Sequence, residues 1–170
     1  MTGRRRPRRK GGTLKDGERR QLARASRHTG DPALPAPGDR ALLLCDGGSR
    51  GNPGPAAIAA VLFAPDGATL EQRAELIGHA SAAEAEYRAI ALALELAAAH
   101  GADPIEVRSD SQLAIAALGS ETPAAVEHAQ LVRDVREAAD RFTAVRWRWH
   151  PRDANEVADA LVRELLWPPH

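Results

Sequence analysis

Cysteine is almost absent from this sequence, which contains a single one, Cys45, within an apolar run. One cysteine excludes an internal disulfide and is typical of a reducing compartment, so we expect a cytoplasmic protein. No apolar stretch approaches the roughly 20 residues that a membrane-spanning helix requires. The N-terminus is basic but has no apolar segment after its charges, so we expect neither a signal peptide nor a membrane partner.

Lysine is missing from residues 41–170, where 11 Arg and 19 Asp+Glu give a net charge of −8. Residues 1–40 contain 12 Lys+Arg and 4 Asp+Glu, a net charge of +8. Basic segments of this kind commonly contact nucleic-acid phosphates. We therefore expect residues 1–40 to form a basic, largely disordered arm with a Pro-rich linker at 29–40, and residues 41–170 to form one folded domain.

Hydropathy patterns along residues 41–170 predict an α/β fold. Short apolar or alternating runs predict strands, and longer runs with helical spacing and without Gly or Pro predict helices. The predicted strands cover 41–45, 56–64, 69–78, 105–109 and 145–150. The predicted helices cover 82–100, a short segment after Asp110, 124–142 and 155–167. This order predicts a mixed five-stranded sheet, an antiparallel meander plus parallel strands, with helices on both faces.

Two of the predicted strands are followed directly by an aspartate, Asp46 and Asp110. If these strands are parallel neighbours, both carboxylates lie at one edge of the sheet, where α/β proteins bind ligands. The loop after Asp46 contains four glycines, which permit close approach of the backbone to another group. Taken alone, the segment fits either a turn at a strand end or a metal-assisted phosphate site.

Helical residues supply further carboxylates. Glu84 and Glu86 lie about 200° apart around the predicted helix, so only one can face the sheet. Glu86 is the better candidate because it lies beside the apolar Tyr87 and Ile90. Asp159 lies at the edge of the apolar stripe of the last helix. Each of these acids, considered singly, could equally be a solvated surface residue or serve the helix dipole.

Taken together, four segments resemble the active-site blocks of the type 1 ribonuclease H family, in the form without the basic handle insertion. The segments are Cys-Asp-Gly-Gly-Ser-Arg-Gly-Asn-Pro-Gly-Pro at 45–55, Ala-Glu-Tyr-Arg-Ala at 85–89, Ser-Asp-Ser-Gln-Leu at 109–113 and Asn-Glu-Val-Ala-Asp-Ala-Leu at 155–161. The resemblance covers residues 41–166. It implies a ribonuclease H-like fold and metal-dependent hydrolysis of the RNA strand of RNA–DNA hybrids.

By this resemblance, the metal ligands are Asp46, Glu86, Asp110 and Asp159. Two Mg²⁺ ions, with Mn²⁺ as an alternative, would activate the attacking water and stabilise the leaving oxygen. Mg²⁺ prefers oxygen ligands, which explains why the chemistry needs carboxylates. The implied partner is an RNA–DNA hybrid, and we expect a monomer.

The residues expected to contact substrate match those of the family only in part. Gly51 and Asn52 correspond to a loop that contacts RNA 2′-hydroxyls, and Gln112 corresponds to another polar contact in the minor groove. Before Glu86 the family usually has Thr-Asn-Asn, whereas this chain has Ser81, Ala82 and Ala83. Ser81 remains a candidate for binding substrate, but two asparagines that would contact the hybrid are absent.

Two residues compete for an auxiliary role in turnover. His150 precedes the last helix, where family members often have a catalytic histidine, and Arg152 could provide a fixed cation near the scissile phosphate. His150 could also be an exposed histidine at a strand end. The junction at 119–123 is too short for the basic handle, so the arm is expected to supply phosphate contacts. Alternative functions are a ribonuclease H-fold binding module with weak or no catalysis, and a nuclease acting on double-stranded RNA.

Overall fold

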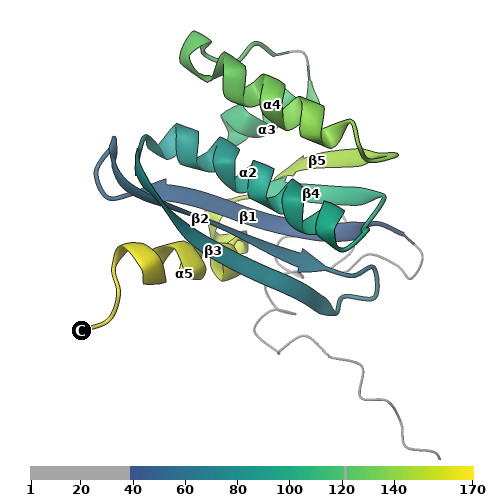
Figure 1. The fold of residues 1–170 in the computed structure, drawn as a ribbon, viewed down its shortest axis with the longest axis horizontal. Coiled ribbons are helices and arrows are strands. Elements are labelled where there is room, and N and C mark those ends of the chain that lie inside the picture. Colours follow the sequence, from purple (N-terminus) through teal and green to yellow (C-terminus); the bar gives the residue numbers. More distant parts are fainter. Residues whose placement is uncertain (1–38, 121) are drawn as a thin grey trace, which may run out of the picture.

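The computed structural model describes residues 39–120 and 122–170. Its elements, labelled in Figure 1, are β1 (Ala41–Ser49), β2 (Gly54–Phe63), β3 (Thr69–Ala80), α2 (Ala82–Ala99), β4 (Ile105–Ser109), α3 (Gln112–Gly119), the 3₁₀ turn η1 (Val126–His128), α4 (Ala129–Ala139), β5 (Val145–Trp149), the 3₁₀ turn η2 (Arg152–Ala154) and α5 (Glu156–Leu166). The predicted basic arm lies outside the described residues, apart from its last two positions.

One five-stranded sheet, in the order β3-β2-β1-β4-β5, organises the described part of the chain. β1 pairs antiparallel with β2, and β2 pairs antiparallel with β3. β4 is parallel to both β1 and β5. Tight turns can join antiparallel neighbours, whereas the parallel strands are reached through helical connections. The predicted mixed sheet is therefore confirmed.

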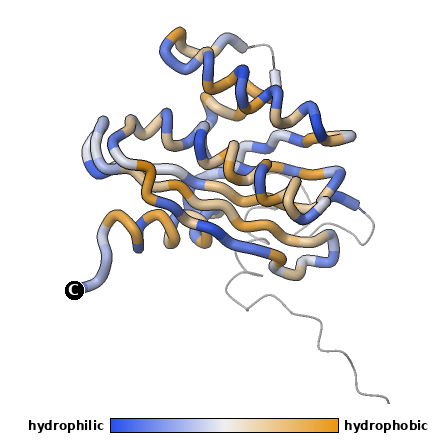
Figure 2. Tube along the Cα trace, in the orientation of Figure 1, coloured by the Kyte–Doolittle hydropathy of each residue, from blue (hydrophilic) through white to orange (hydrophobic). Residues whose placement is uncertain are grey.

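Helices cover both faces of the sheet (Figure 1). α2 packs on one face over β1 and β2, and α4 packs against α2. α5 crosses the opposite face over β1, β2 and β3. The inner strands β1 and β2 are predominantly apolar, as their colour in Figure 2 shows, because each must bury side chains on both faces. None of the helices in the described ranges combines the length and the apolar character that a membrane span requires.

The predicted boundaries that differ most from the structure are those of β1 and α4. β1 does not end before Asp46 but continues to Ser49, because Gly47 and Gly48 pair with Ile58 and Ala57 of β2. The amphipathic pattern over 124–142 also predicts too long a helix. α4 covers only Ala129–Ala139, and the 3₁₀ turn η1 precedes it. Glycines after a short apolar run are compatible with a turn, but glycine can equally occupy an extended strand, as Gly47 and Gly48 do here.

Candidate metal centre

Three carboxylates from three elements meet beside the centre of the sheet. Asp46 lies within β1, Glu86 lies in the first part of α2, and Asp110 directly follows β4. One oxygen atom of each lies within 4.8 Å of the others. The parallel pairing of β1 with β4 brings Asp46 and Asp110 together, and the packing of α2 on β1 adds Glu86.

Gly47 explains why α2 can approach β1 so closely. A Cβ atom at this position would lie 2.3 Å from the backbone carbonyl of Ala85 and 2.7 Å from the backbone nitrogen of Glu86. The helix backbone therefore rests directly on the glycine. The sequence indicated that these glycines allow a close approach, and at Gly47 the approaching group is α2 itself.

Glu86, rather than Glu84, faces the other carboxylates. Its carboxylate accepts a hydrogen bond from the Gly47 backbone N–H and one from the Ser109 hydroxyl, at 3.4 Å. Glu84 instead points toward Arg88, with 3.7 Å between the charged atoms. Ser81 is the N-cap of α2, since its Oγ accepts from the backbone N–H of Glu84.

Asp159 approaches the cluster from α5 on the opposite face of the sheet. It is buried, and its negative charge acts on both Asp46 and Asp110. Its carboxylate accepts a hydrogen bond from Arg163, one helical turn later. The buried Asn155 holds the start of α5 against β1 by donating from Nδ2 to the Cys45 carbonyl, at 2.8 Å. Sequence reasoning did not assign roles to Arg163 or Asn155, although the spacing of four residues between Asp159 and Arg163 was a usable signal.

The two candidates for an auxiliary role lie in different environments. The His150 side chain is fully buried, and its backbone N–H donates to the Ser109 carbonyl. The alternative of an exposed histidine at the strand end is therefore wrong. Arg152 is 77% exposed, and its Nε lies 3.7 Å from Oδ2 of Asp110.

Burial and mutual repulsion disfavour the charged forms of these acids. Burial raises the pKa of Asp46 to about 7, and the negative charges of Asp110 and Asp159 act in the same direction. Burial and the charges of Asp46 and Asp110 also raise the pKa of Glu86. Burial raises the pKa of Asp110 as well, although the nearby Arg152 opposes that shift. The cluster therefore carries an electrostatic cost whenever all its members are ionised without a cation.

This cost predicts a pH-dependent gain in stability for Asp46→Asn in EDTA. The raised pKa means that the folded state binds the Asp46 proton more tightly than the unfolded state. The stability of wild type therefore falls as the pH rises from about 4, where the unfolded carboxyl ionises, to about 7, where the folded one does. We expect the variant to be more stable by up to about 4 kcal/mol at pH 8, and the difference to disappear near pH 4. Urea denaturation at both pH values measures it, with the exposed Glu95→Gln as a control. Equal stability of Asp46→Asn and wild type at pH 8 would contradict this.

The donor set fits a divalent cation that prefers oxygen ligands. Oδ1 of Asp46 is buried and has no hydrogen-bond partner among the described residues, so a cation would satisfy an atom that the protein leaves unpaired. Asp46, Glu86 and Asp110 could hold the ion, and Asp159 could contribute from the other side. The part of the chain described here thus contains the donors that such a centre needs.

The predicted substrate-contact residues surround this cluster. Asn52 lies in the exposed β1–β2 loop, where its Oδ1 accepts from the backbone N–H of Ala82 at 3.0 Å. Gly51, beside it, has a φ of 76°, which a glycine adopts without strain. Gln112 is exposed at the start of α3. The loop and the beginnings of α2 and α3 could therefore all contact one substrate.

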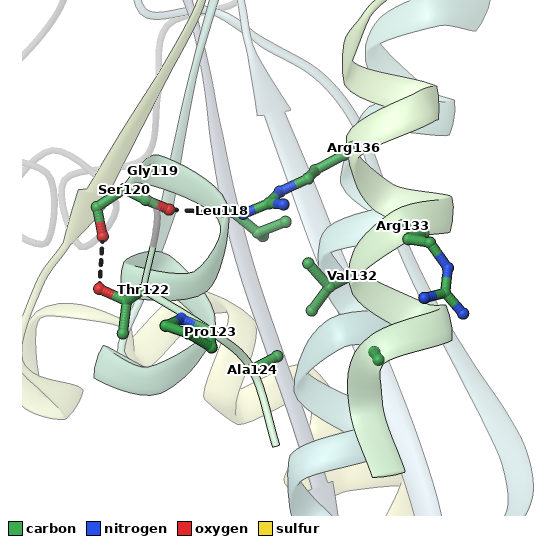
Figure 3. Close-up of a pocket in the computed structure, with 10 residues that line it drawn as sticks. Leu118, Gly119, Ser120, Thr122, Pro123, Ala124, Val132, Arg133 and Arg136 are labelled. Atoms are coloured by element: carbon green, nitrogen blue, oxygen red, sulfur yellow. Dashed lines mark hydrogen bonds between the residues drawn. The ribbon is translucent and has the colours of Figure 1, made fainter. Parts of the chain in front are cut away.

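A cavity of about 790 Å³ lies away from the carboxylates, between α3 and α4. Figure 3 shows Arg133 and Arg136 on its α4 side and Pro123 on the connecting segment. Arg136 donates to the carbonyls of Ala117 and Ser120 at the end of α3. Arg136 therefore connects α4 to the end of α3, and the cavity lies at the short junction between these two helices.

A sheet of this order, with acidic side chains converging from β1, α2, β4 and α5, is typical of the ribonuclease H-like nucleases. The family model described as "Reverse transcriptase-like" matches residues 44–165. Ribonuclease HI of Halobacterium salinarum is 39% identical over 136 residues, which are 78% of this chain and 67% of that protein. The chain belongs to the type 1 ribonuclease H family, as the sequence motifs indicated.

Solved structures agree with this assignment. The crystal structure of the Halobacterium salinarum RNase H1 has a TM-score of 0.72 at 40% identity, covering 75% of this chain and 97% of that one. The N-terminal RNase H domain of a Mycobacterium tuberculosis protein has a TM-score of 0.70 at 32% identity, covering 74% and 92%. LC11-RNase H1, solved in complex with an RNA/DNA hybrid, has a TM-score of 0.69 at 30% identity, covering 75% and 96%.

The mycobacterial relative is much longer than this chain. The full protein, described as bifunctional, is 33% identical over 131 residues, which are 75% of this chain but 35% of the relative. The similarity therefore concerns its RNase H domain.

Proposed function

We propose that this protein is an endonuclease that hydrolyses the RNA strand of RNA–DNA hybrids with the help of two divalent metal ions. The observation that carries the proposal is the convergence of Asp46, Glu86 and Asp110 within 4.8 Å, on the fold of the ribonuclease H family. A relative that retains this fold has been solved with an RNA/DNA hybrid. A binding module without catalysis would gain nothing from retaining a repulsive acidic cluster.

Metal ions bound at this centre would supply activation of the attacking water and stabilisation of the leaving oxygen. We propose Asp46 as the shared ligand, and the interaction of its charge with both Asp110 and Asp159 supports this role. Glu86 would be held in position by the hydrogen bonds from Gly47 and Ser109. We propose Mg²⁺ as the natural ion, with Mn²⁺ as an alternative, since all the donors are carboxylate oxygens.

The remaining residues would bind and orient the RNA strand. Asn52 and Gly51 would contact 2′-hydroxyls from the β1–β2 loop, and Gln112 would contact the minor groove from the start of α3. Ser81 is occupied as a helix cap, so its contribution would be to position Ala82 and Ala83 rather than to bind through its hydroxyl. We expect weaker hybrid binding than in relatives that have asparagines at these two positions.

A substrate panel tests the proposal directly. Labelled RNA–DNA hybrid, duplex RNA and duplex DNA are each incubated with Mg²⁺, Mn²⁺ or EDTA, and the products are resolved by length. Internal cleavage of the RNA strand in the hybrid alone, dependent on metal, is the expected result. Cleavage of duplex RNA at a comparable rate would indicate a double-strand ribonuclease. The absence of any cleavage would indicate a binding module.

Arg152 is the better candidate for assisting turnover. Its guanidinium lies beside Asp110 and is accessible to a phosphate, whereas the His150 side chain is enclosed. We expect Arg152→Ala to lower kcat about tenfold, as for the loss of one charged contact to the reacting phosphate. His150→Ala should mainly lower the melting temperature. Single-turnover rates and thermal melts of both variants separate these effects, and a larger rate loss for His150→Ala would reverse the assignment.

The basic arm would add affinity for the phosphate backbone, because the domain that it precedes is acidic. Deletion of residues 1–38 should raise KM and flatten its dependence on salt, with little change in kcat. The test is the Michaelis constant measured between about 50 and 200 mM salt, the range over which phosphate contacts weaken. Identical salt dependence with and without the arm would show that it only aids solubility.

We also propose that the protein is a monomer and that it is cytoplasmic. The free thiol of Cys45 supports the cytoplasmic location.

A further inference from the structure

A strip of side chains extends along α5 from the buried Asp159 of the metal centre to the exposed Trp167 and Arg50 beside the β1–β2 loop. Asp159 and Arg163 are four residues apart, and Trp167 follows four residues later at the C-cap, so the three lie along one side of the helix. Arg163 donates to Asp159, yet 69% of its side chain is exposed. The guanidinium of Arg50, from the loop, lies over the Trp167 ring, 6.0 Å from its centre.

Packing against β1, β2 and β3 holds α5 in place along this strip. Asn155 anchors the start of the helix to the Cys45 carbonyl. Further along, a Cβ atom on Gly48 would lie 3.4 Å from Cγ1 of Val162, so the helix packs against the strand at van der Waals distance. The strip is therefore a fixed surface whose two ends are Asp159 in the metal centre and Arg50 beside Gly51 and Asn52.

The exposed side chains of this strip are better suited to binding a nucleic-acid strand than to packing inside the protein. Trp167 is 54% exposed, which is unusual for a large aromatic side chain in a folded domain. Exposed tryptophan offers a π-face on which a base can stack, and arginines on either side can pair with the phosphates that flank it. Bases inside a duplex are already stacked on both faces, so the strip fits an unpaired nucleotide rather than the hybrid itself.

We propose that Arg50, Arg163 and Trp167 bind unpaired RNA that continues from the RNA strand of the hybrid beyond the cleavage site. The proposal rests on the proposed function, because that function brings an RNA strand to the carboxylates at one end of the strip. Arg163 would then leave Asp159 to contact a phosphate, and Trp167 would stack with a base. The protein would favour hybrids whose RNA strand extends past the paired region.

Equilibrium binding in EDTA tests this without requiring cleavage. Fluorescence anisotropy compares a blunt hybrid with hybrids that carry unpaired RNA at the 5′ end or the 3′ end, or unpaired DNA. We expect one of the RNA extensions to tighten binding about five- to a hundredfold, the range of one stacked base. Trp167→Ala should remove this preference, Trp167→Phe should retain part of it, and Arg163→Gln should weaken it.

Arg133→Ala, which removes an exposed arginine from α4, provides the matched control and should retain the preference. Equal binding of blunt and extended hybrids by wild type, an equal gain from unpaired DNA, or a preference that survives Trp167→Ala would overturn the proposal. Cleavage of the blunt hybrid with Mg²⁺ is measured on the same preparation. If the blunt hybrid is cleaved but unpaired RNA does not tighten binding, the result counts against the strip alone. If unpaired RNA tightens binding but no hybrid is cleaved, the result supports the strip and counts against the proposed function.

Discussion

Asp46→Asn is expected to reduce the cleavage of an RNA–DNA hybrid by about a thousandfold or more. The substitution removes a negative oxygen from the position that interacts with both Asp110 and Asp159, while it preserves the shape of the side chain. A metal ion contributes several kcal/mol of charge stabilisation in the transition state, and each 1.36 kcal/mol corresponds to a tenfold change in rate. Cleavage of labelled hybrid under single-turnover conditions measures the loss.

The two glutamates of α2 provide a matched comparison for this prediction. Glu86→Gln removes a member of the carboxylate cluster, whereas Glu84→Gln removes a partly exposed acid that faces Arg88. Activity should be lost in the first variant and retained in the second. Circular dichroism should show folded protein in every case. Near-normal metal-dependent cleavage by Asp46→Asn would exclude a shared-ligand role for this residue.

Gly47→Ala is expected to damage both the fold and the activity, even though it changes no charged group. The new methyl group would lie 2.3 Å from the helix backbone at Ala85, and backbone atoms cannot move aside as a flexible side chain can. Overpacking of this kind costs about 3 kcal/mol. Displacement of Glu86 by roughly 1 Å would lower kcat about a hundredfold as well. Urea denaturation and hybrid cleavage measure the two effects.

The neighbouring Gly48→Ala is the control for this variant. Its added Cβ would point to the other face of the sheet and lie 3.4 Å from a side-chain methyl group of Val162, which is ordinary contact. We expect a change in stability of less than about 1 kcal/mol. If Gly47→Ala proves as stable and as active as Gly48→Ala, then close contact between β1 and α2 does not position the metal centre.

Sequence patterns predicted the fold because each element has a strong periodic or compositional signal. The choice of Glu86 over Glu84 followed from helix geometry, since only one of two residues 200° apart can face the sheet, and from the apolar neighbours of Glu86. The end of β1 could not be predicted in this way, because an extended glycine and a turn glycine are identical in sequence. Only the pairing of Gly47 with Ile58 distinguishes them.

Contacts between segments far apart in the sequence also could not be predicted from it. His150 directly follows β5, whose residues are all at least partly exposed, yet its own side chain is fully buried, and no local sequence pattern predicts that difference. The cation–π contact between Arg50 and Trp167 joins residues 117 positions apart, and no periodic sequence pattern predicts it. By contrast, the ion pair between Asp159 and Arg163 was within reach of sequence analysis, because it follows the spacing of one helical turn.

The hydrogen bond between Asn52 and Ala82 limits what the β1–β2 loop can recognise. The backbone N–H of Ala82 is a donor, so the side-chain atom of Asn52 that meets it must be the oxygen. The exposed amide group of Asn52 can then only donate hydrogen bonds. A loop with this polarity selects groups with lone pairs, such as the oxygen of a ribose hydroxyl, and gains nothing from a deoxyribose methylene. Ala82 and Ala83 replace the two asparagines on α2, but the hydrogen bond to Ala82 gives Asn52 a single orientation, in which its NH₂ group is available to donate.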